Sequence, residues 1–217
     1  MMAKVKMPLL GVKASGQIGK SVVLGSWRGV QYARTHVHPA NPRTAEQMKT
    51  RGVFSFLNEL WKRLPPSVVE VWQAYAAGRP LTDRNAFLKF NVSTLRGASN
   101  VLDIVISPGV AGGYPPADVL VDVDAENNTL TVDVVAPPLP SGWDILKVHV
   151  MALKNEDPHG APTEYPFYGA VELPPYTVVL DGLTDGTSYV VAVFMEYTKP
   201  DGTKAYGPSV NTGPFTV

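Results

Sequence analysis

The sequence predicts an α+β protein in which a small β-hairpin and several helices, residues 1–110, precede an all-β sandwich, residues 111–217. Three observations predict this division. Residues 1–110 carry 15 Lys/Arg and 5 Asp/Glu, whereas residues 111–217 carry 4 and 14, so a neutral chain has oppositely charged halves. A Gly- and Pro-rich stretch, residues 108–116, lies at the same place. Helical spacing of apolar residues precedes this stretch, and short strand-like segments follow it. The boundary implies that deleting residues 115–217 leaves a folded, helix-rich remnant.

Composition excludes several classes of protein. The 217 residues contain no cysteine, which excludes a disulfide scaffold, a cysteine nucleophile and a cysteine-ligated metal site. No apolar run reaches 18 residues, and the first ten residues lack the continuous apolar stretch of a signal peptide. We therefore expect a soluble protein made in the cytoplasm, without a membrane partner.

The first element is a predicted hairpin. Residues 17–24 and 30–37 are strand-like, and residues 25–29 are long enough for the connecting loop. Two strands alone are marginally stable in water, so we expect this ribbon to pack on another element or to join the sheet of a neighbouring subunit.

Three helices are predicted next. Residues 44–47, Thr-Ala-Glu-Gln, fit a capping box, and apolar residues at steps of three and four continue from there to Pro65. A second cap at residues 67–70 opens a shorter helix, and a third helix follows Thr82. Residues 101–106 then read as a buried strand.

Residues 10–95 also carry an ordered set of short motifs. These are Ser15-Gly16-Gln17-Ile18-Gly19, Trp27-Arg28-Gly29 with Arg34, Asn41-Pro42-Arg43-Thr44-Ala45-Glu46-Gln47 with Arg51, Trp61, Trp72, and Asn85-Ala86-Phe87 followed by Asn91. Their order resembles an uncharacterised module found in tailed-phage virion genes and in proteins of Bacteroidetes. The resemblance implies a phage structural protein and implies no reaction.

The second half contains short strand candidates separated by turn residues. They are residues 119–124, 129–134, 145–152, 177–180 and 189–197. Five to seven such strands in roughly 100 residues favour an immunoglobulin-like sandwich.

Residues 180–193 resemble the corner that precedes the penultimate strand of fibronectin type III domains, and Gly207-Pro208-Ser209 resembles the start of that family's last strand. The resemblance implies that the Tyr189 hydroxyl bonds back to the preceding loop. The chain departs from the family in lacking an early tryptophan, since Trp143 lies before the third strand instead.

No catalytic, cofactor-binding or metal-binding residue is predicted. His36 and His38 share a strand face and suit a metal or a phosphate, but no third ligand lies nearby in sequence. We expect His149 on the sandwich surface and His159 in a loop. Residues 16–21 resemble the end of a phosphate-binding loop, but Ala14 replaces the required glycine.

Acidic residues gather at the start of the predicted sandwich. Asp122 and Asp124 alternate on one strand face, where calcium is an alternative if a loop supplies more oxygens. The favoured interpretation is a solvated acidic face that discourages pairing between strand edges.

The favoured function is a non-enzymatic phage virion protein, capsid- or tail-associated, that assembles in many copies in the host cytoplasm. Its basic half docks on the particle, and its sandwich projects or contacts neighbours. Opposite charges on the two halves favour a head-to-tail contact with copies of itself and with other virion proteins. The candidate assembly contacts are Trp27, Arg28, Arg34, Arg43 and Arg51.

Two alternatives compete. A nucleic-acid-binding protein would use the basic half, but its cations spread over strands, loop and helix ends instead of one dense run, so we do not expect nucleic acid as the partner. A carbohydrate or cell-surface adhesion module would bind a host-surface glycan through exposed aromatic residues of a Pro-rich loop. The same aromatic cluster suits a protein partner equally well. The residues of this candidate recognition loop are Tyr165, Phe167, Tyr168 and Tyr176.

Overall fold

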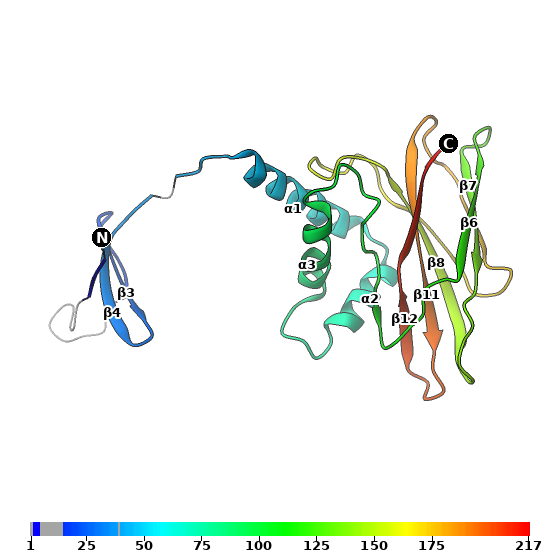
Figure 1. Cartoon of the computed structure of the whole chain (residues 1–217), viewed down its shortest axis with the longest axis horizontal. Helices are drawn as coiled ribbons and strands as arrows, with labels where there is room; N and C mark the ends of the chain where they lie inside the picture. Colours follow the sequence, from blue (N-terminus) through cyan, green and yellow to red (C-terminus); the bar gives the residue numbers. More distant parts are fainter. Residues whose placement is uncertain (1, 5–14, 39) are drawn as a thin grey trace. The chain divides into compact units, whose positions relative to one another are not determined.

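The computed structural model describes residues 2–4, 15–38 and 40–217, and the chain divides into two compact units, residues 1–43 (unit 1) and 44–217 (unit 2). Unit 1 is a small antiparallel sheet, and unit 2 combines helices with a β-sandwich (Figure 1). The division therefore lies at residue 43, and the predicted boundary at 110/111 falls inside unit 2.

Unit 1 is a four-stranded sheet with the order β1 (Met2–Lys4), β4 (Val30–Thr35), β3 (Val22–Trp27), β2 (Gly16–Ile18). The predicted strand over residues 17–24 is two strands, because the chain turns at Gly19, whose φ is +56°. The predicted two-stranded ribbon is thus the centre of a wider sheet, in which β1 pairs with the free side of β4.

The helices of unit 2 are α1 (Ala45–Arg63), α2 (Pro66–Ala76) and α3 (Asp83–Leu95). The Thr44 side chain caps α1 by accepting from the Gln47 amide, and Thr82 caps α3 by accepting from the Asn85 amide. The predicted cap at Ser67 is wrong. Helix α2 starts at Pro66 with Pro65 as its N-cap residue, two positions before the predicted cap, and Pro66 has no N–H that needs a partner.

The sandwich places a small sheet against a large one. The small sheet has the order β10 (Thr177–Leu180), β7 (Thr129–Val135), β6 (Asp118–Asp124). The large sheet has the order β5 (Pro108–Val110), β12 (Lys204–Pro208), β11 (Ser188–Thr198), β8 (Asp144–Lys154), β9 (Phe167–Val171), and β13 (Val210–Thr216) also pairs with β11. One apolar cluster joins β7 and β10 to β8 and β11, so the two sheets share a core in the manner of immunoglobulin-like sandwiches.

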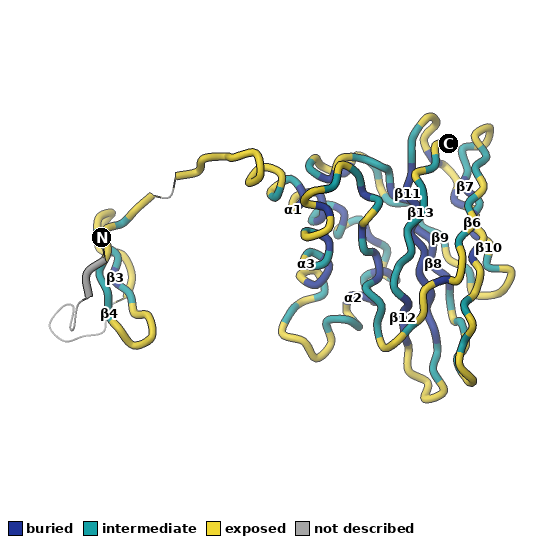
Figure 2. The backbone as a smooth tube through the Cα atoms, viewed as in Figure 1, coloured by how far each residue is buried: buried dark blue, intermediate teal, exposed yellow. Residues whose placement is uncertain are grey.

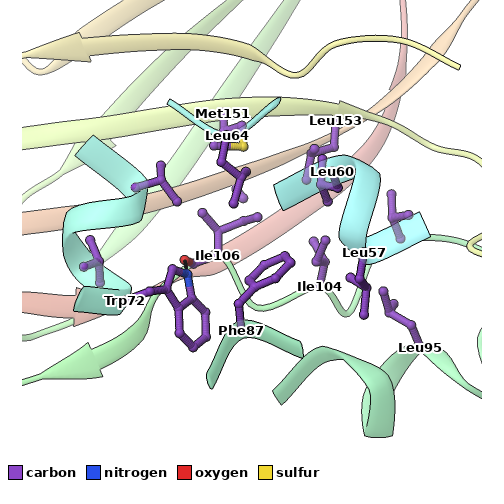
Figure 3. Packing of buried hydrophobic residues seen from close by; sticks show 14 of the residues in the cluster. Leu57, Leu60, Leu64, Trp72, Phe87, Leu95, Ile104, Ile106, Met151 and Leu153 are labelled. Carbon is purple, nitrogen blue, oxygen red and sulfur yellow. Dashed lines mark hydrogen bonds between the residues drawn. The ribbon is translucent and has the colours of Figure 1, made fainter. Parts of the chain in front are cut away.

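The helices form a third layer on the other face of the large sheet, so that β8 and β11 are dark along most of their length when coloured by burial (Figure 2). Val148 and Val150 point into the sandwich core, whereas Met151 and Leu153 belong to the cluster that contains the helices. Figure 3 shows Leu153 beside Leu60 of α1, and Met151 beside Leu64, which directly follows α1. The helices and the large sheet therefore share one core, and this core spans the predicted boundary at 110/111.

Residues 101–107 are not the predicted strand. They follow an irregular path in the core shared by the helices and the large sheet, where Ile104 and Ile106 are buried (Figure 3). The indole nitrogen of Trp72 on α2 donates to the Ile106 carbonyl at 2.9 Å. A buried backbone without sheet pairing needs partners of this kind.

Two asparagine side chains form hydrogen bonds with other backbone groups of this segment. Asn91 on α3 accepts from the Val105 amide at 2.6 Å and donates to the Val105 carbonyl at 3.0 Å. Asn211 on β13 donates to the carbonyls of Leu102 and Ile104, at 2.6 Å each. These side chains replace a ladder of backbone bonds, which explains why an apolar run of strand-like composition is not a strand here.

Candidate interaction surfaces

Unit 1 is a cationic sheet whose described residues form little core of their own. Residues 1–43 contain seven Lys/Arg and no Asp or Glu. Among the residues that the structure describes in this unit, Leu24 alone is a buried hydrophobic residue. A small sheet of this kind gains its stability by covering an apolar face. Unit 1 therefore presents apolar surface that a partner can cover.

One side of this sheet combines aromatic and cationic residues. The register places Trp27 opposite Val30 and Gly25 opposite Tyr32, so these side chains share a side. Trp27 is 67% exposed and Val30 is 46% exposed. A Cβ atom at Gly25 would lie 2.6 Å from the Tyr32 hydroxyl oxygen, so the glycine leaves the ring room to lie across β3. We call this side, with the adjoining arginines, the aromatic face; its members are Trp27, Arg28, Val30, Tyr32 and Arg34.

The structure brings together three of the five predicted assembly contacts. The guanidinium carbon of Arg28 lies 4.8 Å from the centroid of the Trp27 ring, at the tip of the β3–β4 hairpin. Arg34 is exposed near the other end of β4 and shares the side of Trp27. Arg43 is the last residue of unit 1, and Arg51 lies on α1 in unit 2. These two therefore do not belong to the aromatic face.

The outer side of the small sheet is acidic. Cross-strand register aligns Asp122 with Thr131 and Val179, and aligns Leu120 with Asp133 and Thr177. Strands β6, β7 and β10 contain no Lys, Arg or His. Exposed aliphatic side chains lie among the carboxylates, since Leu120 is 57% and Val179 is 58% exposed. We call this side the acidic face; its members are Asp118, Leu120, Asp122, Asp133, Val135 and Val179.

Asp124, at the end of β6, stabilises the turn that follows this strand. Its carboxylate accepts from the Asn127 side chain at 2.6 Å and from the amides of Asn127 and Glu126 at 3.1 Å. These bonds, that from the Asn127 side chain first, lower the pKa of Asp124. Within the described ranges no cluster of three or more His, Cys, Asp or Glu could hold a metal ion. The rings of His36 and His38, which are two apart in the sequence, lie in edge contact with centroids 4.6 Å apart.

The predicted aromatic recognition loop is not one exposed cluster. Tyr165 is 72% exposed, and its ring lies 4.7 Å from the guanidinium of Arg63. Phe167 and Tyr168 lie on β9 and alternate across it, so Phe167 packs on the sandwich core and Tyr168 on the core with the helices. Tyr176 packs on the sandwich core as well. Because three of the four rings pack on the two cores, they do not form the predicted sugar-stacking surface.

A buried polar cluster lies between the helices and the large sheet, and sequence analysis missed it. His149, predicted on the surface, is 1% exposed and stacks on Phe194 with ring centroids 4.5 Å apart. Its Nε2 lies 3.3 Å from Glu196 and its Nδ1 lies 2.7 Å from the Tyr168 hydroxyl. The Ser67 hydroxyl donates to the same Tyr168 oxygen at 2.7 Å. The unbroken apolar run around His149 on β8 was the signal of burial on both faces.

Glu196 is the acidic member of this cluster. It is 5% exposed and forms an ion pair with Lys204 at 2.7 Å. Burial raises the pKa of Glu196, but hydrogen bonds from His149 and Lys204 lower it by more than burial raises it. The pKa of Glu196 is therefore below its usual value. Because its members come from four strands of the large sheet and from α2, the cluster links the helices to that sheet.

The corner predicted at Tyr189 is confirmed, and the Tyr189 hydroxyl accepts from the Thr184 amide at 3.0 Å. Together with the strand order, this corner defines the class of unit 2 as an immunoglobulin-like sandwich backed by helices. The helices of the described residues include none with the length and apolar character needed to span a bilayer.

No family model matches the chain, and no curated protein matches it in sequence. Among solved structures, it is similar to a fourth FNIII domain of a human protein, in solution, at 17% identity and a TM-score of 0.33, covering 48% of this chain and 81% of that one. It is also similar to a myokine structure at 15% identity and a TM-score of 0.33, covering 48% of this chain and 98% of that one.

Proposed function

We propose that this chain is a structural protein of a phage virion that assembles in multiple copies. Unit 1 is the assembly module, and the sandwich of unit 2, of fibronectin type III type, projects from the particle or contacts neighbours. The observation that carries the proposal is the cationic sheet of unit 1, which exposes Trp27 and Val30 and in which Leu24 alone of the described residues is a buried hydrophobic residue. The ordered motifs from Ser15 to Asn91 support the phage context.

Burying the exposed apolar side chains of unit 1 in a contact with another molecule is energetically favourable. A tryptophan side chain buries about 150–250 Å² when it is enclosed, and each square ångström of apolar surface contributes about 25 cal/mol. With Trp27 67% exposed in one copy, covering its ring alone stabilises a contact by about 3 kcal/mol. Val30 adds to this on the same side of the sheet. Adjacent exposed apolar side chains of this kind are suited to a protein–protein contact.

Unit 2 suits the role of a rigid subunit body. The large sheet is covered on both faces, and the segment 101–107 is held by side chains from α2, α3 and β13. The finer fibronectin type III assignment is supported by the Tyr189 corner and by the Gly207-Pro208 start of the last strand, where β12 passes into β13.

The test is to locate the chain in particles. Particles from a culture of the source organism are purified by density gradient and examined by quantitative mass spectrometry and immunogold microscopy. We expect the chain to band with the particles in many copies each, with label on one part of the particle. A soluble cytoplasmic protein from the same lysate serves as the control for trapping. Recovery of the chain only from the particle-free fractions would contradict the proposal.

A further inference from the structure

We infer that copies of this chain assemble head to tail, with the aromatic face of unit 1 in one copy packed on the acidic face of unit 2 in the next. The inference rests on the proposed function and specifies its contact. The occupant of each face is a second copy of the same chain.

The two faces are complementary in chemistry. On the aromatic face, Arg28 and Arg34 lie at the two ends of a strip that contains the exposed Trp27 and Val30. On the acidic face, Asp118, Asp122 and Asp133 lie among the exposed aliphatic side chains. Each face therefore offers apolar area together with charge of one sign, and the signs are opposite. Such an arrangement steers encounter and disfavours wrong partners.

The charges of the whole units agree with this pairing. Residues 1–43 carry seven basic and no acidic side chains, whereas residues 44–217 carry twelve basic and nineteen acidic ones. The formal charges are +7 and −7, so each unit repels its own kind and attracts the other. Like charge disfavours pairing between two units of the same type, so these totals favour a heterologous contact over a symmetric contact between like faces.

The geometry of the faces suits sheet-on-sheet packing. Both are sides of antiparallel sheets, which pack about 10 Å apart through interdigitating side chains. The acidic face exposes Leu120, Val135 and Val179, which are unsuited to a polyanion, and its carboxylates repel one. A nucleic acid could cover the aromatic face alone, whereas a second copy covers both faces at once. A heterologous contact of this kind closes into rings or grows into tubes.

The experiment measures self-association of the full chain by sedimentation velocity and light scattering at low and high salt. One variant, Arg28→Glu with Arg34→Glu, reverses the aromatic face. Another, Asp118→Lys with Asp122→Lys, reverses the acidic face. A control, Glu70→Lys with Asp103→Lys, makes the same change of charge at exposed positions on α2 and in the segment 101–107.

The wild-type chain is expected to form oligomers that dissociate as salt rises, because the contact depends on opposite charges. Each face-reversed variant is expected to associate at least a hundredfold more weakly. An equimolar mixture of the two variants regains the oligomers, because each reversed face then meets a complementary one. The control variant associates like the wild type.

Circular dichroism first establishes that each variant is folded. Trp27→Asp, which keeps every arginine, provides a second route to the same contact and is expected to weaken association at least tenfold. Wild-type oligomers that survive both reversals and Trp27→Asp overturn the inference, as does a chain that stays monomeric at every concentration. Assembly that appears only on adding duplex DNA overturns it as well. Presence of the chain in purified particles together with any of these outcomes leaves the proposed function standing and removes the head-to-tail contact alone.

Discussion

Replacing Trp72 tests whether the helices and the sandwich unfold as one unit. The Trp72 ring is fully buried and makes edge contacts with Phe87 and Phe90 at centroid distances of 5.4 and 5.6 Å. Its indole nitrogen also donates to the Ile106 carbonyl. Trp72→Ala therefore leaves a cavity, at a cost of about 3–5 kcal/mol, and an unpaired buried carbonyl, at about 1–3 kcal/mol. We expect unit 2 to lose at least about 4 kcal/mol of its free energy of unfolding.

Hydrogen exchange followed by mass spectrometry shows which elements of unit 2 lose protection in the variant. Four kcal/mol corresponds to about a thousandfold increase in the population of the open state. Because α2 and the large sheet share one core, we expect amides of β7, in the small sheet, to exchange faster by the same factor as amides of α3. Trp27→Ala, at an exposed site in unit 1, serves as the matched control and is expected to change unit 2 by less than about 0.5 kcal/mol.

Cooperative unfolding of the helices with the sandwich is refuted if Trp72→Ala accelerates exchange in the helices while β7 and β10 keep their wild-type protection. That pattern would mean that the helices open without the sandwich, as the boundary at 110/111 requires. A measured loss below about 1 kcal/mol would also contradict the packing of Trp72.

Three further predictions follow from unit 2. Gly52→Ala should lower the free energy of unfolding by about 1–3 kcal/mol and lower the melting temperature, because the added Cβ would lie 2.3 Å from the His159 carbonyl oxygen. A higher melting temperature would refute this. The lowered pKa of Glu196 implies stability that is present above the unfolded pKa of about 4.5 and lost as pH falls through the folded pKa. In urea titrations between pH 3 and 6, Glu196→Gln should therefore lose less stability on acidification than the wild type, and parallel pH profiles would contradict this. A fragment of residues 1–110 should lack a cooperative melt by circular dichroism, because α1–α3 lose the sheet on which they pack; a sharp transition would show an independent helical domain.

Local signals in the sequence predicted much of unit 2. Thr44 and Thr82 cap helices as expected, because a cap depends on bonds within four residues. The five predicted strands are present, and the Tyr189 corner closes on a residue five positions earlier. The turn at Gly19 was missed because a single positive φ value splits an otherwise continuous apolar pattern.

The candidate surfaces were predicted in part. Trp27 and Arg28 are neighbours in sequence, so their contact required no tertiary information. Phe167 and Tyr168 were grouped as one exposed cluster because the sequence did not show that they lie on opposite faces of one strand, each packed on a different core. The burial of His149 was missed because an alternating outer face was assumed for a sheet that is covered on both sides.

The sequence by itself determined the periodicities of the helices and strands, the caps at Thr44 and Thr82, and the excess of basic residues before residue 110 and of acidic residues after it, since these are properties of residues close together along the chain. The tertiary structure alone decided that the helices cover the second face of the large sheet. It also decided that Asn211 pairs the backbone at Ile104, 107 positions away. Charge and Gly/Pro content describe the surface and the flexibility of a chain, whereas a domain boundary depends on which apolar faces share a core. That choice is made by long-range packing, and for this reason the boundary lies at residue 43.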